Sequence, residues 1–222
     1  MIQIFPTKNG TGVAIYGDYG DLIALYDTVH YIASSLNEHS KYQKGQHQLL
    51  MNFAYEIRKA YTGNRLKEKL TYSGEEKKVE YFGFYFVWTD ILIFISTLRH
   101  NAGYISTDKL HQGNLYLLEF FIEKALFEYD TEGAGHIKEF ICQRIPIIDK
   151  YVFLIYQALH IKFVSEKPGK KRFRNIPDYI LKYFNSYSKE YKEMITFLEV
   201  SAKKQNCEIL DLEFSEFPDI KW

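Results

Sequence analysis

The sequence predicts an α+β fold that is mostly helical, with a small, mainly antiparallel sheet packed against a helical layer. Segments with strand character occur near the beginning, in the middle and at the end of the chain, and helical patterns fill the intervals between them. The strands do not alternate with helices at regular βαβ spacing, which disfavours a doubly wound parallel sheet. With 222 residues and no clear linker, we expect a single α+β domain over residues 1–222.

The N-terminal segment predicts a β-hairpin followed by two helices. Apolar alternation indicates two strands joined by a glycine-containing turn at residues 8–12. Asp18 or Asp21 can cap the first helix, because a carboxylate accepts hydrogen bonds from the free amides at a helix start. The first helix extends to about Ser34, and the second, which follows a polar loop, ends near Gly63.

The central segment, residues 79–103, changes from a strand pattern to a helix pattern. Up to Trp88 the residues are almost all apolar or aromatic, which predicts a strand covered on both faces. From Thr89 the apolar residues recur at helical spacing, so Thr89 is expected to cap a core helix. Asp90 would lie in its first turn, and Gly103 would end it. The charged residues before this segment predict an exposed connector with a short strand near residues 70–72.

Five features organise the second half of the chain. A helix capped within Ser106-Thr107-Asp108 is expected to bury one apolar face, and residues 131–135 are expected to interrupt it before a short helix. Pro146 is predicted to begin the next helix, and Pro177 a last helical region that reaches about residue 204, with a change of direction near residues 185–186. Residues 208–214 alternate between apolar and acidic side chains, which predicts a C-terminal edge strand. The expected apolar face of the Asp108 helix consists of Leu110, Leu117, Leu118, Phe121, Ile122, Ala125 and Leu126.

Composition excludes several classes of protein. The 28 basic and 28 acidic side chains give a formal net charge of zero, which disfavours a dedicated nucleic-acid binder. No secretory signal is visible, and the apolar run before Leu98 contains Asp90, so we expect no membrane segment and a cytoplasmic location. Cys142 and Cys207 lie in no motif and are expected to be reduced packing residues.

The N-terminal segment also resembles a known family. It reads Thr-Gly-Val-Ala-Ile-Tyr-Gly-Asp-Tyr over residues 11–19 and is followed by Asp21-Leu22 and Leu25-Tyr26-Asp27. This is similar to an uncharacterised bacterial family, a domain of unknown function, whose members open with a T-G-V-x-I-x-G-D-Y hairpin leading into a helix. The resemblance implies a bacterial, intracellular protein. That family has no assigned activity, so the resemblance implies no catalytic residue.

A basic segment is the sharpest charge cluster. Phe173 lies within it and could stack on a base, while the cations could contact phosphates. The alternative is a solvated loop, since charge runs usually face water. The cluster consists of Lys167, Lys170, Lys171, Arg172 and Arg174.

A polar pocket at the end of the central helix is a second hypothesis. Arg99 and His100 would meet Asp18 or Asp21 there, and the carboxylates would tune the pKa of the histidine. The alternative is that the two basic residues stabilise the C-terminus of the helix through its dipole.

Tyrosines recur every fourth residue along the last helical region. Tyrosine is enriched at protein interfaces, so this stripe could be a ridge that binds a partner. It could equally be the edge of the protein's own core, because the chain has 19 tyrosines. The stripe consists of Tyr179, Tyr183, Tyr187 and Tyr191.

The sequence contains no recognised catalytic or cofactor motif. It lacks the P-loop, the dinucleotide-binding glycines, the G-x-S-x-G elbow and the H-E-x-x-H and C-x-x-C metal motifs. We therefore expect no cofactor, no metal site and no catalytic residue that sequence alone can identify.

The expected function is macromolecular binding to a protein partner, in a regulatory, adaptor or toxin-neutralising role. One alternative is an enzyme whose site is assembled from scattered polar residues. Another is nucleic-acid binding through residues 167–174. A broad exposed aromatic patch would favour the binding protein, and a deep pocket with converging polar groups would favour the enzyme.

Overall fold

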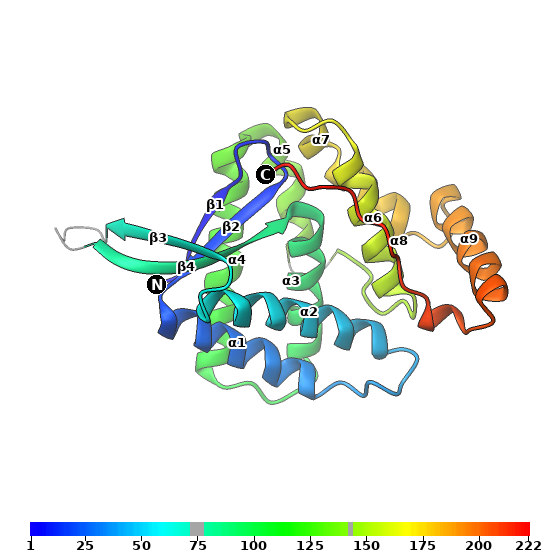
Figure 1. Ribbon diagram of the computed structural model, residues 1–222, viewed down its shortest axis with the longest axis horizontal. Helices are drawn as coiled ribbons and strands as arrows, with labels where there is room; N and C mark the ends of the chain where they lie inside the picture. The colour runs from blue at the N-terminus through cyan, green and yellow to red at the C-terminus, as the bar shows by residue number, and fades with distance from the viewer. Residues whose placement is uncertain (72–77, 142–143) are drawn as a thin grey trace.

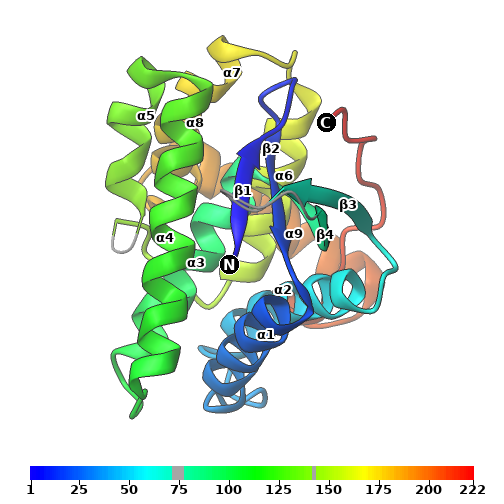
Figure 2. The same cartoon turned by 90° about the vertical axis from the view of Figure 1, so that its left-hand side faces the viewer.

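The computed structural model describes residues 1–71, 78–141 and 144–222 and confirms the predicted α+β fold. Within these ranges the strands form one antiparallel sheet in the order β1-β2-β4-β3, and helices cover it on one side (Figures 1 and 2). The strands are β1 (Gln3–Pro6), β2 (Gly12–Gly17), β3 (Leu66–Thr71) and β4 (Lys78–Val87). The α-helices are α1 (Tyr19–Ser34), α2 (Lys44–Tyr61), α3 (Trp88–Ala102), α4 (Lys109–Tyr129), α5 (Thr131–Ile137), α6 (Val152–Ser165), α7 (Lys170–Arg174), α8 (Ile176–Phe184) and α9 (Lys189–Gln205).

The N-terminal hairpin and the cap of α1 follow the sequence prediction. β1 pairs with β2 in antiparallel register, and Gly10 in the turn adopts a positive φ of 63°, which glycine tolerates without strain. Asp18 accepts from the backbone amide of Asp21 at 2.9 Å, and the Asp21 carboxylate accepts from the amide of Asp18 at 3.1 Å. The two carboxylates thus form a reciprocal capping box at the start of α1.

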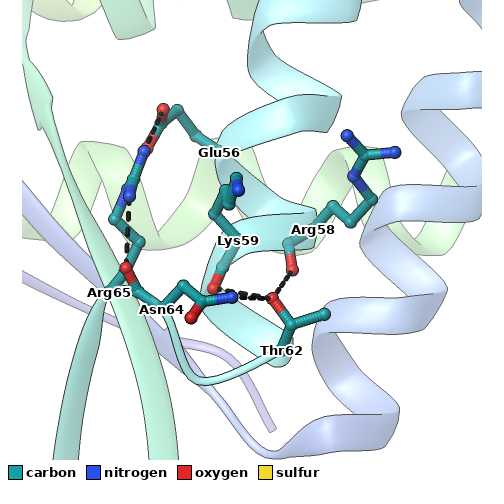
Figure 3. A network of polar contacts seen from close by, with 6 residues as sticks. All are labelled: Glu56, Arg58, Lys59, Thr62, Asn64 and Arg65. Atoms are coloured by element: carbon teal, nitrogen blue, oxygen red, sulfur yellow. Dashed lines mark hydrogen bonds and ion pairs between the residues drawn. The ribbon is translucent and has the colours of Figure 1, made fainter.

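The C-terminus of α2 is closed by a polar network that turns the chain toward β3 (Figure 3). The Thr62 hydroxyl donates to the carbonyls of Arg58 and Lys59, at 2.9 and 3.1 Å, and the same carbonyls accept from the backbone amides of Thr62 and Asn64. Arg65, the residue before β3, then donates two hydrogen bonds to the carboxylate of Glu56, at 2.7 and 2.9 Å. The predicted short strand is therefore present at Leu66–Thr71, whereas Tyr72 lies outside the described residues.

The central strand β4 pairs with both β2 and β3, and one of its faces carries the aromatic core. Phe84 and Phe86 pack edge-on against Phe53, which stacks on Phe94 of α3. The other face is covered less completely than predicted. Its side chains include buried tyrosines and Tyr85, which is 36% exposed and stacks on Trp222 at the end of the chain, with 4.7 Å between ring centroids.

Helix α3 begins two residues earlier than a cap at Thr89 would place it, and Thr89 does not cap it. The N-cap residue is Val87, whose side chain has no acceptor, and Thr89 lies inside the helix. Its hydroxyl instead donates to Asp90 at 3.1 Å. The strand continues directly into the helix, so the backbone amide of Trp88 is bound by the carbonyl of Thr11. Asp90 in the first turn and Gly103 at the end are as predicted.

Three predictions for the second half of the chain are wrong. Residues 131–135 belong to helix α5, because the Asp130 carboxylate accepts from the amide of Gly133 and caps it. Pro146 does not begin a helix. An Asx-type turn, in which the amide of Tyr151 donates to Asp149 at 2.8 Å, leads into α6, which starts at Val152.

The third wrong prediction is the C-terminal strand. Ile209–Asp211 form a short 3₁₀-helix, and the described residues after it pair with no strand. The chain instead crosses the outside of α6 and ends beside the hairpin (Figure 1, red). There the carbonyl of Lys221 accepts from the Thr11 hydroxyl at 2.5 Å. The predicted change of direction near residue 185 is confirmed, and Ser188 caps α9.

Candidate protein-binding surface

The basic segment is a short helix, not a loop, and part of it is buried. Phe173 is fully buried between the rings of Trp88 and Tyr129, so it is not accessible to stack on a base. Arg174 binds Asp130 through two hydrogen bonds of 2.6 and 2.9 Å, and Lys170 lies 3.2 Å from the same carboxylate. These contacts explain why a cationic run is present in a neutral protein without forming a free basic patch.

Arg172 in this segment has a structural role. Its side chain is 2% exposed, and burial lowers the pKa of its guanidinium. It donates to the carbonyls of Phe163 and Glu166 at 3.3 and 3.2 Å and to the Thr11 hydroxyl at 2.7 Å. The guanidinium therefore joins the end of α6 to the N-terminal hairpin. Of the predicted cluster, Lys167 and Lys171 remain exposed and make no contact that the fold depends on in the described residues.

The predicted polar pocket is not formed as expected. His100 lines a hollow together with Ser35, at the C-terminal end of α1, whereas Asp18 and Asp21 cap the opposite end. A helix of 16 residues is about 24 Å long, so the carboxylates are far from the imidazole. Arg99 instead binds Glu119 of α4 at 2.7 Å.

His100 nevertheless lies between two hollows of about 610 Å³ each. One of them is lined only by uncharged residues, and its floor is a buried pair of amides in which Asn101 donates to Gln46 at 2.8 Å. Burial lowers the pKa of His100, so the imidazole is neutral at physiological pH. The arrangement offers hydrogen-bonding groups and aromatic walls, but it contains no carboxylate to act as a base.

The four tyrosines do not form a continuous ridge. Helix α8 ends at Phe184, so Tyr187 lies in the turn before α9, where it is 85% exposed. Tyr179 is buried and donates to Glu166, and Tyr191 donates to Asp149 at 2.7 Å. Tyr183 is half-buried against the core. The hydroxyls thus satisfy contacts within the protein, which agrees with the core alternative for three of them.

Helix α4 carries exposed apolar side chains that the predicted sites did not include. One of its faces is buried in the core, as predicted for Leu118, Phe121, Ile122, Ala125 and Leu126. A second face of the helix carries exposed apolar side chains, and α4 lies along the outer side of the molecule (Figure 2). On this face Leu110 is 61% exposed and Phe120 is 61% exposed, with Leu117 between them at 38%. The sequence prediction placed Leu110 and Leu117 on the buried face, and that placement is wrong.

We call this exposed face the α4 stripe and define it by six positions that share one side of the helix. At about 100° per residue, they all lie within an arc of about 100°. A Cβ added at Gly113 would meet no described atom within 4 Å, so the stripe is open at this position. The α4 stripe consists of Leu110, Gly113, Leu117, Phe120, Lys124 and Phe127, of which Gly113 and Phe127 are partly buried.

Two cationic side chains contact aromatic rings at the edges of the α4 stripe. The Arg99 guanidinium lies over the ring of Tyr116, 4.5 Å from its centroid, and Tyr116 is 63% exposed beside the stripe. Lys138 lies 5.9 Å from the ring centroid of Phe127 at the other end. These cation–π contacts restrict the rings before any partner binds, which lowers the entropy cost of association.

The described residues contain no candidate metal cluster and no candidate membrane-spanning helix. Within residues 1–71, 78–141 and 144–222, no three His, Cys, Asp or Glu side chains are grouped to hold a metal ion. Cys207 is exposed and unpaired, contrary to its predicted packing role, and Cys142 lies outside the described residues. None of the helices in those ranges is long and apolar enough to span a membrane.

Fold and surface together define an α+β protein with a small antiparallel sheet and a helix that is apolar on two faces. The chain belongs to the family described as "Domain of unknown function (DUF6904)", whose model matches residues 2–222. This agrees with the resemblance to an uncharacterised family. Comparison with curated proteins and with solved structures finds no match.

Sequence reasoning missed the α4 stripe for an identifiable reason. The predicted face followed only the apolar residues that fit one helical surface, and Tyr116 and Phe120 fall outside that set. A helix that is apolar around most of its circumference is expected to be buried on more than one side. That signal was present over residues 110–127, but the sequence does not show which of the two faces packs on the core.

Proposed function

We propose that this protein acts by binding another protein, and that the α4 stripe is its binding surface. The observation that carries the proposal is the second apolar face of α4. Monomeric proteins rarely expose contiguous apolar patches of this kind, and those they do expose usually mark interaction sites. Leu110, Leu117 and Phe120 are exposed along one face of the same helix, which is a suitable platform for a partner.

The spacing and charge of α4 define the chemistry of the partner. Stripe positions alternate between intervals of three and four residues, the spacing with which two helices pack side by side. Lys109 begins α4, and Glu128 lies near its C-terminal end, 40% exposed. The partner we propose is therefore an amphipathic helix with apolar residues at the same spacing, an acidic residue opposite Lys109 and a basic residue opposite Glu128.

Photo-cross-linking at the stripe tests this function. The photoreactive amino acid p-benzoylphenylalanine replaces Phe120 in one variant and Leu181, an equally exposed residue of α8, in the control. We expect a discrete protein adduct from position 120, none from position 181, and loss of the adduct when Leu110 and Leu117 are changed to Ser. The adducts are identified by mass spectrometry, including those with a second copy. Equal cross-linking from both positions, or none from position 120, would refute the proposal.

A second candidate function is supported by the hollow beside His100. Its size is within the range of small-molecule sites, and its uncharged lining suits an uncharged polar ligand that hydrogen-bonds to the Gln46–Asn101 amides. In this candidate, polar residues that are scattered in the sequence assemble a ligand-binding site, in place of the enzyme site that the sequence suggested as an alternative. A thermal-shift screen of nucleosides and simple sugars tests it: a hit must stabilise the wild type and not Asn101→Leu. Absence of any hit that depends on Asn101 would dismiss it.

A further inference from the structure

We infer that the helix that binds the α4 stripe is α4 of a second copy of this chain, in antiparallel orientation. This inference rests on the proposed function, because it names the partner of the same surface. The argument depends on the spacing of the stripe, on the steric fit at its centre and on the charges at its ends.

The spacing of the α4 stripe reads the same from either end. Its six positions are separated by three, four, three, four and three residues along α4. If two copies pack antiparallel about a twofold axis between residues 118 and 119, each stripe position lies opposite another stripe position. The resulting pairs are Leu110 with Phe127, Gly113 with Lys124, and Leu117 with Phe120.

The central pairs are sterically complementary. Gly113 has open space where a side chain would be, and the long aliphatic stem of Lys124, which is 56% exposed, can lie across it. Leu117 and Phe120 then meet on both sides of the axis and provide the apolar centre of the contact. A large residue opposite a small one lets neighbouring layers interdigitate without leaving a void.

The charges at the ends favour antiparallel over parallel packing. The same twofold axis brings Lys109 of one copy opposite Glu128 of the other, and this pair occurs twice in the dimer. Parallel packing would instead set Lys109 and Lys124 against the same residues of the second copy, and Gly113 against Gly113. Like charges and a central gap would oppose that arrangement.

Cysteine cross-linking tests both the dimer and its orientation. In a chain with Cys142→Ser and Cys207→Ser, one variant carries Gly113→Cys and another Lys124→Cys. We expect a short bis-maleimide to form covalent dimers when the two variants are mixed, and few in either variant alone, because identical positions are about 16 Å or more apart along the antiparallel axis. Adding Phe120→Ser to both variants should abolish the product.

Each other outcome has a definite meaning. Efficient cross-linking of Gly113→Cys to itself would replace the antiparallel arrangement with a parallel one and overturn the inference. If no sample forms a dimer while position 120 cross-links to a different protein, the inference fails and the proposed function stands. If neither experiment gives a product, both fail. Should Cys142→Ser prevent folding, the pair is made with Cys142 retained, and the parent without new cysteines measures its background.

Discussion

Asp90 and His160 form an ion pair inside the core, with 2.7 Å between Oδ2 of Asp90 and Nδ1 of His160. Burial alone would lower the pKa of His160, but attraction to Asp90 and the hydrogen bond to it outweigh burial, and the pKa is raised. The edge of Phe217, in the C-terminal segment, packs against the imidazole. The pair connects the first turn of α3 to α6, and it gives stability a predictable dependence on pH.

We predict that Asp90→Asn lowers the free energy of unfolding by roughly 3–5 kcal/mol, as expected when a buried pair loses one partner. Because the folded pKa of His160 is raised, the stabilisation is complete below 6.5, the ordinary histidine pKa, and is lost as pH rises through the folded value. Urea unfolding at several pH values, with the exposed Asp27→Asn as control, measures this. A difference from wild type that stays the same from below pH 6.5 to well above it would contradict this prediction.

Asp130 is predicted to make the protein sensitive to acid. The hydrogen bond from Arg174 lowers the pKa of this carboxyl, burial opposes the shift, and the Gly133 amide and Lys170 lower it further. The stabilisation is therefore present above the ordinary pKa of 3.8 and is lost as pH falls through the lower folded value.

Two substitutions at position 130 separate the helix-capping role of Asp130 from its ionic contacts. Asp130→Asn can still cap α5 but loses the ionic contacts, whereas Asp130→Ala also loses the cap, at a further cost of about 1 kcal/mol. Acid unfolding followed by circular dichroism should show a weaker pH dependence below pH 3.8 in both variants. An acid transition identical to that of wild type in Asp130→Asn would rule out this role.

Neighbouring basic residues are predicted to differ sharply in their effect on stability. Arg172→Lys removes the planar set of donors that reaches Phe163, Glu166 and Thr11, so we expect a loss of at least about 2 kcal/mol. Lys171→Ala, at an exposed position, should change stability by less than about 0.5 kcal/mol. Thermal unfolding of the two variants measures the contrast, and similar melting temperatures would argue against a structural role for Arg172.

Exchanging the charges of Lys109 and Glu128, at the two ends of α4, is predicted to preserve most of the affinity of self-association. Lys109→Glu alone and Glu128→Lys alone should each weaken self-association about two- to tenfold, because each breaks two exposed pairs in the dimer. The double variant restores opposite charges and should recover most of the affinity, apart from the intrachain contact of Glu128 with Lys124. Dissociation constants from sedimentation give the coupling energy between Lys109 and Glu128. A double variant whose affinity falls by the product of the two single losses would exclude the pairing.

Local signals allowed much of the fold to be predicted. Asp18 and Asp21 cap α1 within a few residues of sequence, and the change of period near Trp88 marks where β4 becomes α3. Errors arose where a distant partner decides the outcome. The basic segment reads as a solvated loop, yet Asp130 and Thr11, far from it in sequence, bind its cations and bury Arg172.

The same reasoning explains two further errors. Residues 208–214 have strand alternation, but a strand also needs a free edge to pair with, and this segment begins as a 3₁₀-helix that contacts α9 and pairs with no strand. In α4, Leu110 and Leu117 fit the helical period of the buried face, although the surface they form is exposed. Periodicity identifies apolar faces, whereas packing decides which of them faces water.

The most direct test of the binding surface is the mass of the protein in solution. Sedimentation equilibrium is measured over a wide concentration range for wild type, for Phe120→Ser on the α4 stripe and for Leu181→Ser on α8 as an equally exposed control. We predict that wild type and the control approach twice the mass of 26.3 kDa as concentration rises, while Phe120→Ser remains at the monomer mass. A wild type that stays monomeric, or a Phe120→Ser variant that associates as wild type does, would contradict the account.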